Sequence, residues 1–151
     1  MIARGIKRVV FAALLAGSVL PAVADDVELK VVTDKGLFIF SVEVAETAAQ
    51  RQQGLQHRKN LAASAGMLFD YKRVQPVAMW MKNTLIPLDM LFIDSAGRIV
   101  NVARNTEPMS LATIPSAAPV LAVLEVNAGT ARRLGIQPGD RVLHAIFGNA
   151  R

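Results

Sequence analysis

Lys82 and Asp89 are the charged residues whose spacing most clearly allows chemistry in this sequence. They stand at the inner ends of two apolar runs, Val77–Met81 and Leu88–Ile93, which flank a short polar segment. Two such runs around turn-forming residues predict a β-hairpin. Antiparallel pairing that is symmetric about the loop would place the Lys82 ammonium opposite the Asp89 carboxylate.

A cation and an anion at the rim of an apolar hairpin allow two kinds of site. They could orient a polar ligand, or the carboxylate could act as a base while the ammonium stabilises negative charge. Asn83 and Thr84, between the two runs, would supply hydrogen bonds. The architectural alternative is that Lys82 and Asp89 pair to close the hairpin and satisfy each other. Both alternatives fit the sequence.

Three further residues are candidates for the same site. Trp80, the sole Trp, could be a stacking platform, although a Trp among Met and Val residues is more often part of the core. Glu125 is a lone acid in an apolar run, and it either faces solvent or meets a basic residue such as Arg51 or Lys82. Arg51 is by default a solvated charge.

Neither a metal site nor a cofactor is predicted. The chain has no Cys, which excludes thiolate ligands and thiol catalysis. His57 and His144 share no ligand spacing with each other or with carboxylates. Alternating Met residues in apolar strands more often fill a core than bind copper. The sequence also contains no phosphate-binding Gly loop, G-x-S-x-G or H-E-x-x-H motif.

The first residues have the pattern of a secretory signal peptide. Three basic residues precede an apolar run over residues 9–23, which ends in the small-residue site Ala22-Val23-Ala24. We therefore expect cleavage after Ala24, with residues 1–24 as the signal and a periplasmic or secreted product. The apolar run is shorter than the roughly 20 residues that a membrane helix needs, so no stable membrane insertion is expected after cleavage.

The charge of the mature chain argues against nucleic acid as a partner. The precursor has 17 basic and 12 acidic residues, and removal of residues 1–24 takes away three basic ones and leaves a net charge of +2. The remaining Lys and Arg residues are scattered and not interleaved with aromatic residues. A small polar ligand is therefore the expected partner, and no protein partner is indicated.

The remaining pattern predicts a single β-rich domain over residues 25–151. Two short helices are expected, one from the capping box at Thr47 to Gln53 and one over 130–134. A Pro-containing loop over 105–119 could form a wall of the site. The fold class is mostly β, a compact β-sandwich or partly closed barrel. Besides the central hairpin, the expected strands are 27–33, 37–44, 66–69, 98–104, 120–126 and 142–147.

The run Trp80–Ile93 resembles the signature of the bacterial and archaeal domain-of-unknown-function 192 family. The similarity covers most of residues 37–143, with further matching segments at 42–47, 51, 54–55, 66–69, 114–116, 124–125, 128–130 and 135–140. It implies a compact, β-rich, sandwich-like domain that is often exported, and it implies no activity. It also favours a single cluster made of Lys82, Asn83, Thr84, Asp89, Arg51 and Glu125.

These observations favour a periplasmic small-ligand-binding or accessory module whose pocket contains Lys82 and Asp89. One alternative is a metal-independent hydrolase or lyase that uses Asp89 or Glu125 as the base and Lys82 as the electrostatic group. A second alternative is a structural envelope protein in which the charged pair only holds the hairpin.

Overall fold

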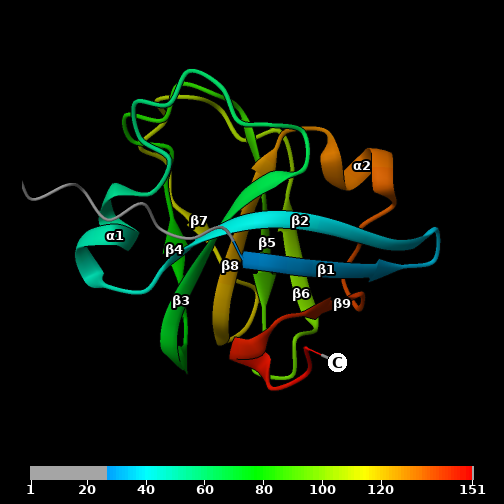
Figure 1. Cartoon of the computed structure of the whole chain (residues 1–151). Coiled ribbons are helices and arrows are strands. Elements are labelled where there is room, and N and C mark those ends of the chain that lie inside the picture. Colours follow the sequence, from blue (N-terminus) through cyan, green and yellow to red (C-terminus); the bar gives the residue numbers. More distant parts are fainter. Residues whose placement is uncertain (1–26, 151) are drawn as a thin grey trace, which may run out of the picture.

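One curled β-sheet organises residues 27–150, the part of the chain that the computed structural model describes. The predicted signal peptide lies outside the described residues. Seven strands follow the order β6-β5-β8-β3-β2-β1-β9, and β4 and β7 form a separate two-stranded sheet (Figure 1). The elements are β1 (Val27–Thr33), β2 (Gly36–Ala45), α1 (Ala48–Gln53), β3 (Ala65–Gln75), β4 (Ala78–Met79), β5 (Leu88–Ile93), β6 (Ile99–Ala103), β7 (Ile114–Pro115), β8 (Val120–Asn127), α2 (Thr130–Leu134), β9 (Arg141–Leu143) and a 3₁₀ turn (Ala145–Phe147).

The two edges of the large sheet meet, so that the sheet is nearly a barrel. Arg98, just before β6, forms a bridge with Arg141 in β9. Nearby, the Ile99 N–H donates to the Asp140 carbonyl at 2.9 Å, and the Val142 N–H donates to the Gly97 carbonyl at 2.7 Å. These bonds satisfy edge groups that would otherwise be open to solvent. The expected single domain with a partly closed barrel and two short helices is confirmed.

Both faces of the central strands are buried. Inside the curl, Leu68, Leu91 and Leu124 belong to one apolar core. On the outer face of the same strands, a second core contains Met90 and Phe92. All six residues of β5 are buried, as expected from large apolar side chains on both of its alternating faces. A polar residue in the buried parts of β3, β5 or β8 is therefore forced into an apolar environment.

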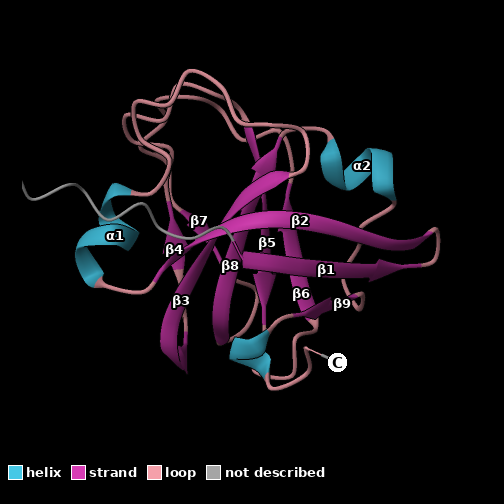
Figure 2. Cartoon of the chain, viewed as in Figure 1, coloured by secondary structure: helices cyan, strands magenta, loops and turns pink. Residues whose placement is uncertain are grey.

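Short strands and loops, rather than helices, cover the outer face of these central strands. Val77, Met79 and Met81 pack into the second core, while α1 and α2 lie at the margins of the sheet (Figure 2). Neither helix, nor the 3₁₀ turn, is long and apolar enough to cross a membrane among the residues described.

The predicted central hairpin is wrong. β4 pairs with β7 through Met79 and Ile114, whereas β5 lies between β6 and β8 in the large sheet. β6 and β8 occupy the two edges of β5, so β4 cannot pair with β5. The chain between them includes Asn83, whose φ of 54° breaks the extended conformation that a ladder requires.

The other predicted elements are confirmed with changed bounds. The β1–β2 hairpin pairs from Val27 with Val42 to Thr33 with Gly36, and the Thr47 capping box begins α1. β3 is longer than the predicted strand 66–69. The last strand is shorter than 142–147, because the His144 Nδ1 accepts from the Ile146 N–H and begins a 3₁₀ turn.

Gly66 is a test of how tightly β3 packs against β8. A Cβ at this position would lie 2.7 Å from the Glu125 carbonyl oxygen, which is too close for two strands to keep their pairing. We expect Gly66→Ala to lower the free energy of unfolding by about 1–3 kcal/mol, measured by urea denaturation. Ser64→Ala, at an exposed neighbour, should change it by less than about 0.5 kcal/mol; equal effects would contradict the close approach.

Candidate functional site

A cavity of about 400 Å³ opens beside α1, on the outer face of the barrel. We call it the α1 cavity. Its walls come from α1 and the turn that follows it, from β3, from β4 with the next loop, and from β8. The side chains that give it chemical character are those of Arg51, Phe69, Tyr71, Trp80, Lys82 and Glu125. The structure thus brings together residues that are 74 positions apart in the sequence.

Glu125 belongs to the most deeply buried part of the cavity lining. It lies on β8 between Met67 of β3 and Met90 of β5, and its side chain is only 4% exposed. Within residues 27–150, no hydrogen bond or ion pair to its carboxyl group is found, and no partner contributes to its pKa shift. Burial raises its pKa to about 8, because the apolar surroundings disfavour the charged form. The group is therefore mainly a neutral acid at pH 7.

Arg51 is held in place at the cavity wall. Its Nη1 donates to the Glu46 carbonyl at 2.7 Å and to the Asp70 carbonyl at 2.8 Å. The guanidinium carbon lies 5.2 Å from the centre of the Tyr71 ring, a distance at which a cation is attracted to the ring face. The interpretation of Arg51 as a solvated charge is therefore wrong, because its guanidinium joins α1 to β3.

Tyr71 completes this side of the cavity. Its hydroxyl donates to the Met79 sulfur at 3.2 Å, and burial raises its pKa to about 12. Neither Phe69 nor Tyr71 was predicted as a site residue, and the strand predicted over 66–69 stops before Tyr71, whereas β3 continues to Gln75. Their signal was present in the alternation of Met67, Phe69 and Tyr71, which places all three on one face of β3.

Trp80 and Lys82 form the mouth of the cavity. Trp80 is 47% exposed, so the interpretation of it as a core residue is wrong. The Lys82 ammonium lies 5.3 Å from the centre of the Trp80 ring. This contact fixes a positive charge at the entrance, beside an aromatic surface.

Asn83 and Thr84 support the loop that carries Lys82. The Asn83 Nδ2 donates to the Gln56 Oε1 at 3.2 Å, and the two side chains line a polar depression next to the cavity. Thr84 is buried, lines the α1 cavity and donates its hydroxyl hydrogen to the Lys82 carbonyl at 3.2 Å. Loop 105–119, predicted as a wall, contributes no residue to the cavity lining.

Asp89 does not pair with Lys82, contrary to the prediction. It lies on the opposite face of the central strands from Glu125, as its alternation with Leu91 in the inner core shows. Its Oδ1 accepts from the Asn105 N–H at 2.9 Å and its Oδ2 accepts from the Ala131 N–H at 2.8 Å. Asp89 lines a different, smaller cavity of about 220 Å³. Its carboxylate therefore anchors α2 and the loop after β6 to β5.

Neither histidine lines the α1 cavity. His57 is exposed and His144 is buried, where burial lowers its pKa. The His144 Nδ1 accepts a backbone hydrogen bond, while its Nε2 has no partner in the part of the chain described. Among residues 27–150 there is no group of three His, Cys, Asp or Glu residues arranged to hold a metal ion.

The family can now be assigned. The model of the domain-of-unknown-function 192 family, DUF192, described as "Uncharacterized ACR", matches residues 30–144. The chain belongs to this family. The resemblance seen in Trp80–Ile93 is thereby confirmed, and most of the barrel and the whole α1 cavity lie within the matched range.

Two solved structures resemble this DUF192 protein closely. A candidate transcription regulator from Sinorhizobium meliloti has a TM-score of 0.77 and 48% identity, covering 79% of this chain and 93% of that one. A protein of unknown function from Novosphingobium aromaticivorans has a TM-score of 0.79 and 39% identity, covering 84% and 91%. No curated protein matches the sequence.

Replacement of Asp89 tests its anchoring role. Asp89→Asn removes the charged acceptor from both backbone N–H groups, and because an amide has a single oxygen it leaves one of them without any acceptor in a fully buried position. We therefore expect the free energy of unfolding to fall by about 1.5–3 kcal/mol. The measurement is urea denaturation, with Asp34→Asn in the exposed β1–β2 turn as the matched control. A loss no greater than that of the control would contradict the anchoring role.

The Glu125 carboxyl should make the stability of this DUF192 protein depend on pH. The unfolded chain releases this proton near pH 4.5, whereas the folded chain keeps it up to about pH 8. The contribution of this proton to the free energy of unfolding is thus fully present below pH 4.5. It is lost by roughly 1.4 kcal/mol per pH unit as the pH rises from 4.5 to about 8. Between pH 5.5 and 7.5, wild type should lose roughly 2–3 kcal/mol relative to Glu125→Gln. Parallel urea titrations at both pH values measure this difference, and a constant difference would contradict the raised pKa.

Proposed function

We propose that this chain is an exported module that binds a small polar ligand in the α1 cavity, with Glu125 at its base. The observation that carries the proposal is the carboxyl group of Glu125, which is almost completely buried and has no partner among the described residues. A buried polar group without a hydrogen bond destabilises a fold by about 1–3 kcal/mol. Such a group on a cavity wall is typical of a site whose partner is a ligand.

The shape and lining of the cavity support the same proposal. Its volume of about 400 Å³ lies in the usual range of roughly 300–1,000 Å³ for small-molecule sites. The apolar surface of Phe69 lies beside a few polar groups, which is the usual composition of a pocket that both holds and orients a ligand. Trp80, exposed at the mouth, adds an aromatic surface against which a ligand can pack.

The place of action that we propose is the periplasm or the cell exterior. The support is the basic, apolar and small-residue pattern of residues 1–24, which is the pattern of a secretory signal. The net charge of +2 that remains after cleavage suits a protein that does not bind anionic polymers. A small ligand present in the envelope is therefore the expected partner.

Enzymatic activity is the second candidate function, and the raised pKa of Glu125 favours it. A carboxyl group with a pKa of about 8 can donate a proton near neutral pH and take it back, as general acid–base catalysis requires. In this reading Glu125 is the proton-transfer group of a hydrolase or lyase, and Lys82 stabilises negative charge. Asp89 no longer serves as an alternative base, because two backbone N–H groups occupy its oxygens in a different cavity.

The similar protein from Sinorhizobium meliloti is described as a candidate transcription regulator, but DNA binding is not proposed for this chain. The helices among residues 27–150 have six and five residues. A helix that reads the major groove needs several exposed side chains along its length, and α1 instead uses Arg51 to bind carbonyl groups of this chain.

A thermal-shift screen against envelope metabolites and sugars tests the proposed function. A ligand of the α1 cavity should raise the unfolding midpoint of wild type by several degrees at saturation, since it binds only the folded state. The shift should shrink in Lys82→Met, which removes the charge at the mouth, and persist in Lys59→Met, whose residue is exposed on another loop and does not line the cavity. A screen in which every compound shifts wild type and Lys82→Met equally would contradict binding at this site.

Turnover separates the two candidate functions. Any compound that binds should be incubated with wild type and Glu125→Gln and its products followed by mass spectrometry. Products formed by wild type and absent with Glu125→Gln would establish the enzyme, whereas an unchanged ligand would establish the binding module.

A further inference from the structure

We propose that the ligand of the α1 cavity is a small organic anion, whose negative charge lies between Arg51 and Lys82 and whose acceptor atoms receive a hydrogen bond from Glu125. This inference rests on the proposed function and narrows it to one chemical class. A carboxylate attached to an apolar ring or chain is the simplest molecule of that class.

The charges that line the cavity are unbalanced. Arg51 and Lys82 both line it, and neither is paired with a carboxylate among residues 27–150; their recorded contacts are carbonyl groups and aromatic rings. Glu125 is the one acidic residue in the lining, and it makes no ion pair with either cation in the described structure. The cavity therefore presents two positive charges to whatever enters it, and an anion is the complement.

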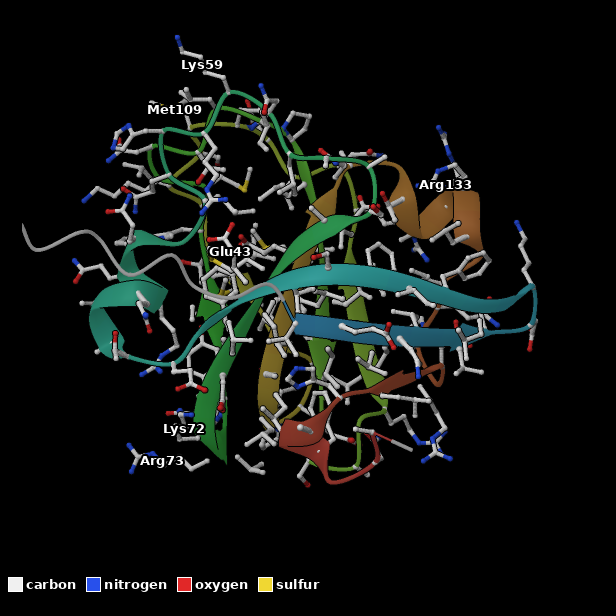
Figure 3. The ribbon with its side chains drawn as sticks, in the orientation of Figure 1. Glu43, Lys59, Lys72, Arg73, Met109 and Arg133 are labelled. Atoms are coloured by element: carbon white, nitrogen blue, oxygen red, sulfur yellow. The ribbon has the colours of Figure 1, made fainter. Side chains whose placement is uncertain are left out.

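Two other basic residues near α1, Lys72 and Arg58, do have carboxylate partners. Lys72 lies 2.8 Å from Asp70 and 3.4 Å from Glu46, and Arg58 pairs with Glu43 through both carboxylate oxygens. Figure 3 shows Lys72 at the far end of β3 and Glu43 nearer the centre of the molecule. These two ion pairs neutralise cations close to α1, whereas the two cations that line the cavity have no such partner within residues 27–150.

Arg51 is arranged to receive an anion without large rearrangement. Two carbonyl oxygens hold Nη1, and the guanidinium carbon lies over the ring of Tyr71. A guanidinium has five N–H donors in a rigid fork, so the carbonyl contacts leave donors for a ligand. Such preorganisation reduces the entropy that binding would otherwise lose.

The main alternative ligand, an amine that pairs with Glu125, fits the cavity less well. An ammonium group would also seek the faces of aromatic rings. Two of the three aromatic rings in the lining, those of Tyr71 and Trp80, already lie against Arg51 and Lys82, at 5.2 and 5.3 Å. A cationic ligand would therefore find two of the three rings occupied, and it would meet the like charges of Arg51 and Lys82 in the same cavity.

The apolar lining indicates that the anion has a carbon body. Leu55, Phe69 and Met79 line the same cavity as the two cations. These side chains give an inorganic anion no contact that would repay its loss of water. A ring or short chain would bury apolar surface against them at about 25 cal/mol per Å².

Anion binding to this cavity should be coupled to the proton on Glu125. The titratable or charged groups that share the lining with Glu125 are Arg51, Tyr71 and Lys82, and a bound anion would add a negative charge beside them. That charge disfavours ionisation of Glu125. Because burial places the pKa of the free group at about 8, binding should take up a proton near pH 8 and should weaken as the pH rises above it.

Isothermal titration calorimetry with three probes of one shape tests the inference. The probes are benzoate, benzamide and benzylamine, which carry a negative charge, no charge and a positive charge on similar frames. Wild type should bind benzoate at least about tenfold more tightly than either of the others, which corresponds to about 1.4 kcal/mol. Lys82→Met should lose most of this preference, and Lys59→Met should keep it.

Proton uptake on benzoate binding distinguishes a titrating Glu125 from a Glu125 that only supports the fold, because a structural role would cause no proton uptake. At pH 8 the heat of benzoate binding should differ between two buffers of unlike ionisation enthalpy in wild type and agree between them in Glu125→Gln. The affinity of Glu125→Gln for benzoate should then be independent of pH between 6 and about 9, because the amide donates a hydrogen bond without titrating.

The outcomes separate this inference from the proposed function. Tighter binding of benzylamine or benzamide than of benzoate would contradict the inference that the ligand is an anion, but the proposal of a ligand-binding cavity would stand. Equal affinity for all three probes, unchanged in Lys82→Met, would also contradict the inference that the ligand is an anion. Absence of binding by all three at millimolar concentration, together with a screen that finds no ligand, would overturn both.

Discussion

Burial of both faces of the central strands is the constraint on which the rest of this structure depends. The sheet curls until β6 and β9 meet, which seals one core inside. The chain between β3 and β5 then folds over the outside, where Val77, Met79 and Met81 seal a second core. The α1 cavity is the place where this outer cover is incomplete, between α1 and the loop that follows β4.

Two acidic residues on neighbouring strands show how the burial of both faces of the sheet determines the environment of a carboxyl group. Asp89 and Glu125 are both at most 4% exposed, and they face opposite sides of the sheet. Asp89 meets two backbone N–H groups at 2.9 and 2.8 Å, so its burial strengthens the fold. Glu125 meets methionines and a cavity, so its burial raises its pKa and leaves its hydrogen-bonding capacity for a ligand.

The cations around the cavity follow a related pattern. Arg51 and Lys82 are placed by carbonyl groups and aromatic rings rather than by carboxylates. These partners fix a side chain without cancelling its charge. An ion pair would have fixed the same side chains and removed the field that attracts a charged ligand. The chemical character of the cavity comes from two cations fixed in place, one neutral carboxyl group and an apolar lining.

Local sequence by itself determined much of this protein. The alternation in Val27–Thr33, the capping box at Thr47 and the two-sided apolar pattern of Leu88–Ile93 predicted elements that the structure confirms, because each depends on residues close together in the chain. The family resemblance in Trp80–Ile93 is likewise local. Residue types and the family resemblance also indicated seven candidate site residues, and six of them line the α1 cavity or the adjoining polar depression.

Only the tertiary structure decided which residues share a site. The hairpin that would have joined Lys82 to Asp89 is replaced by pairings with β7, β6 and β8, and these partners are distant in the sequence. Strand pairing is set by which arrangement buries both faces and satisfies both edges of β5, a property of the whole sheet that no single segment contains. The same global pairing turned Glu125 toward the cavity and Asp89 away from it.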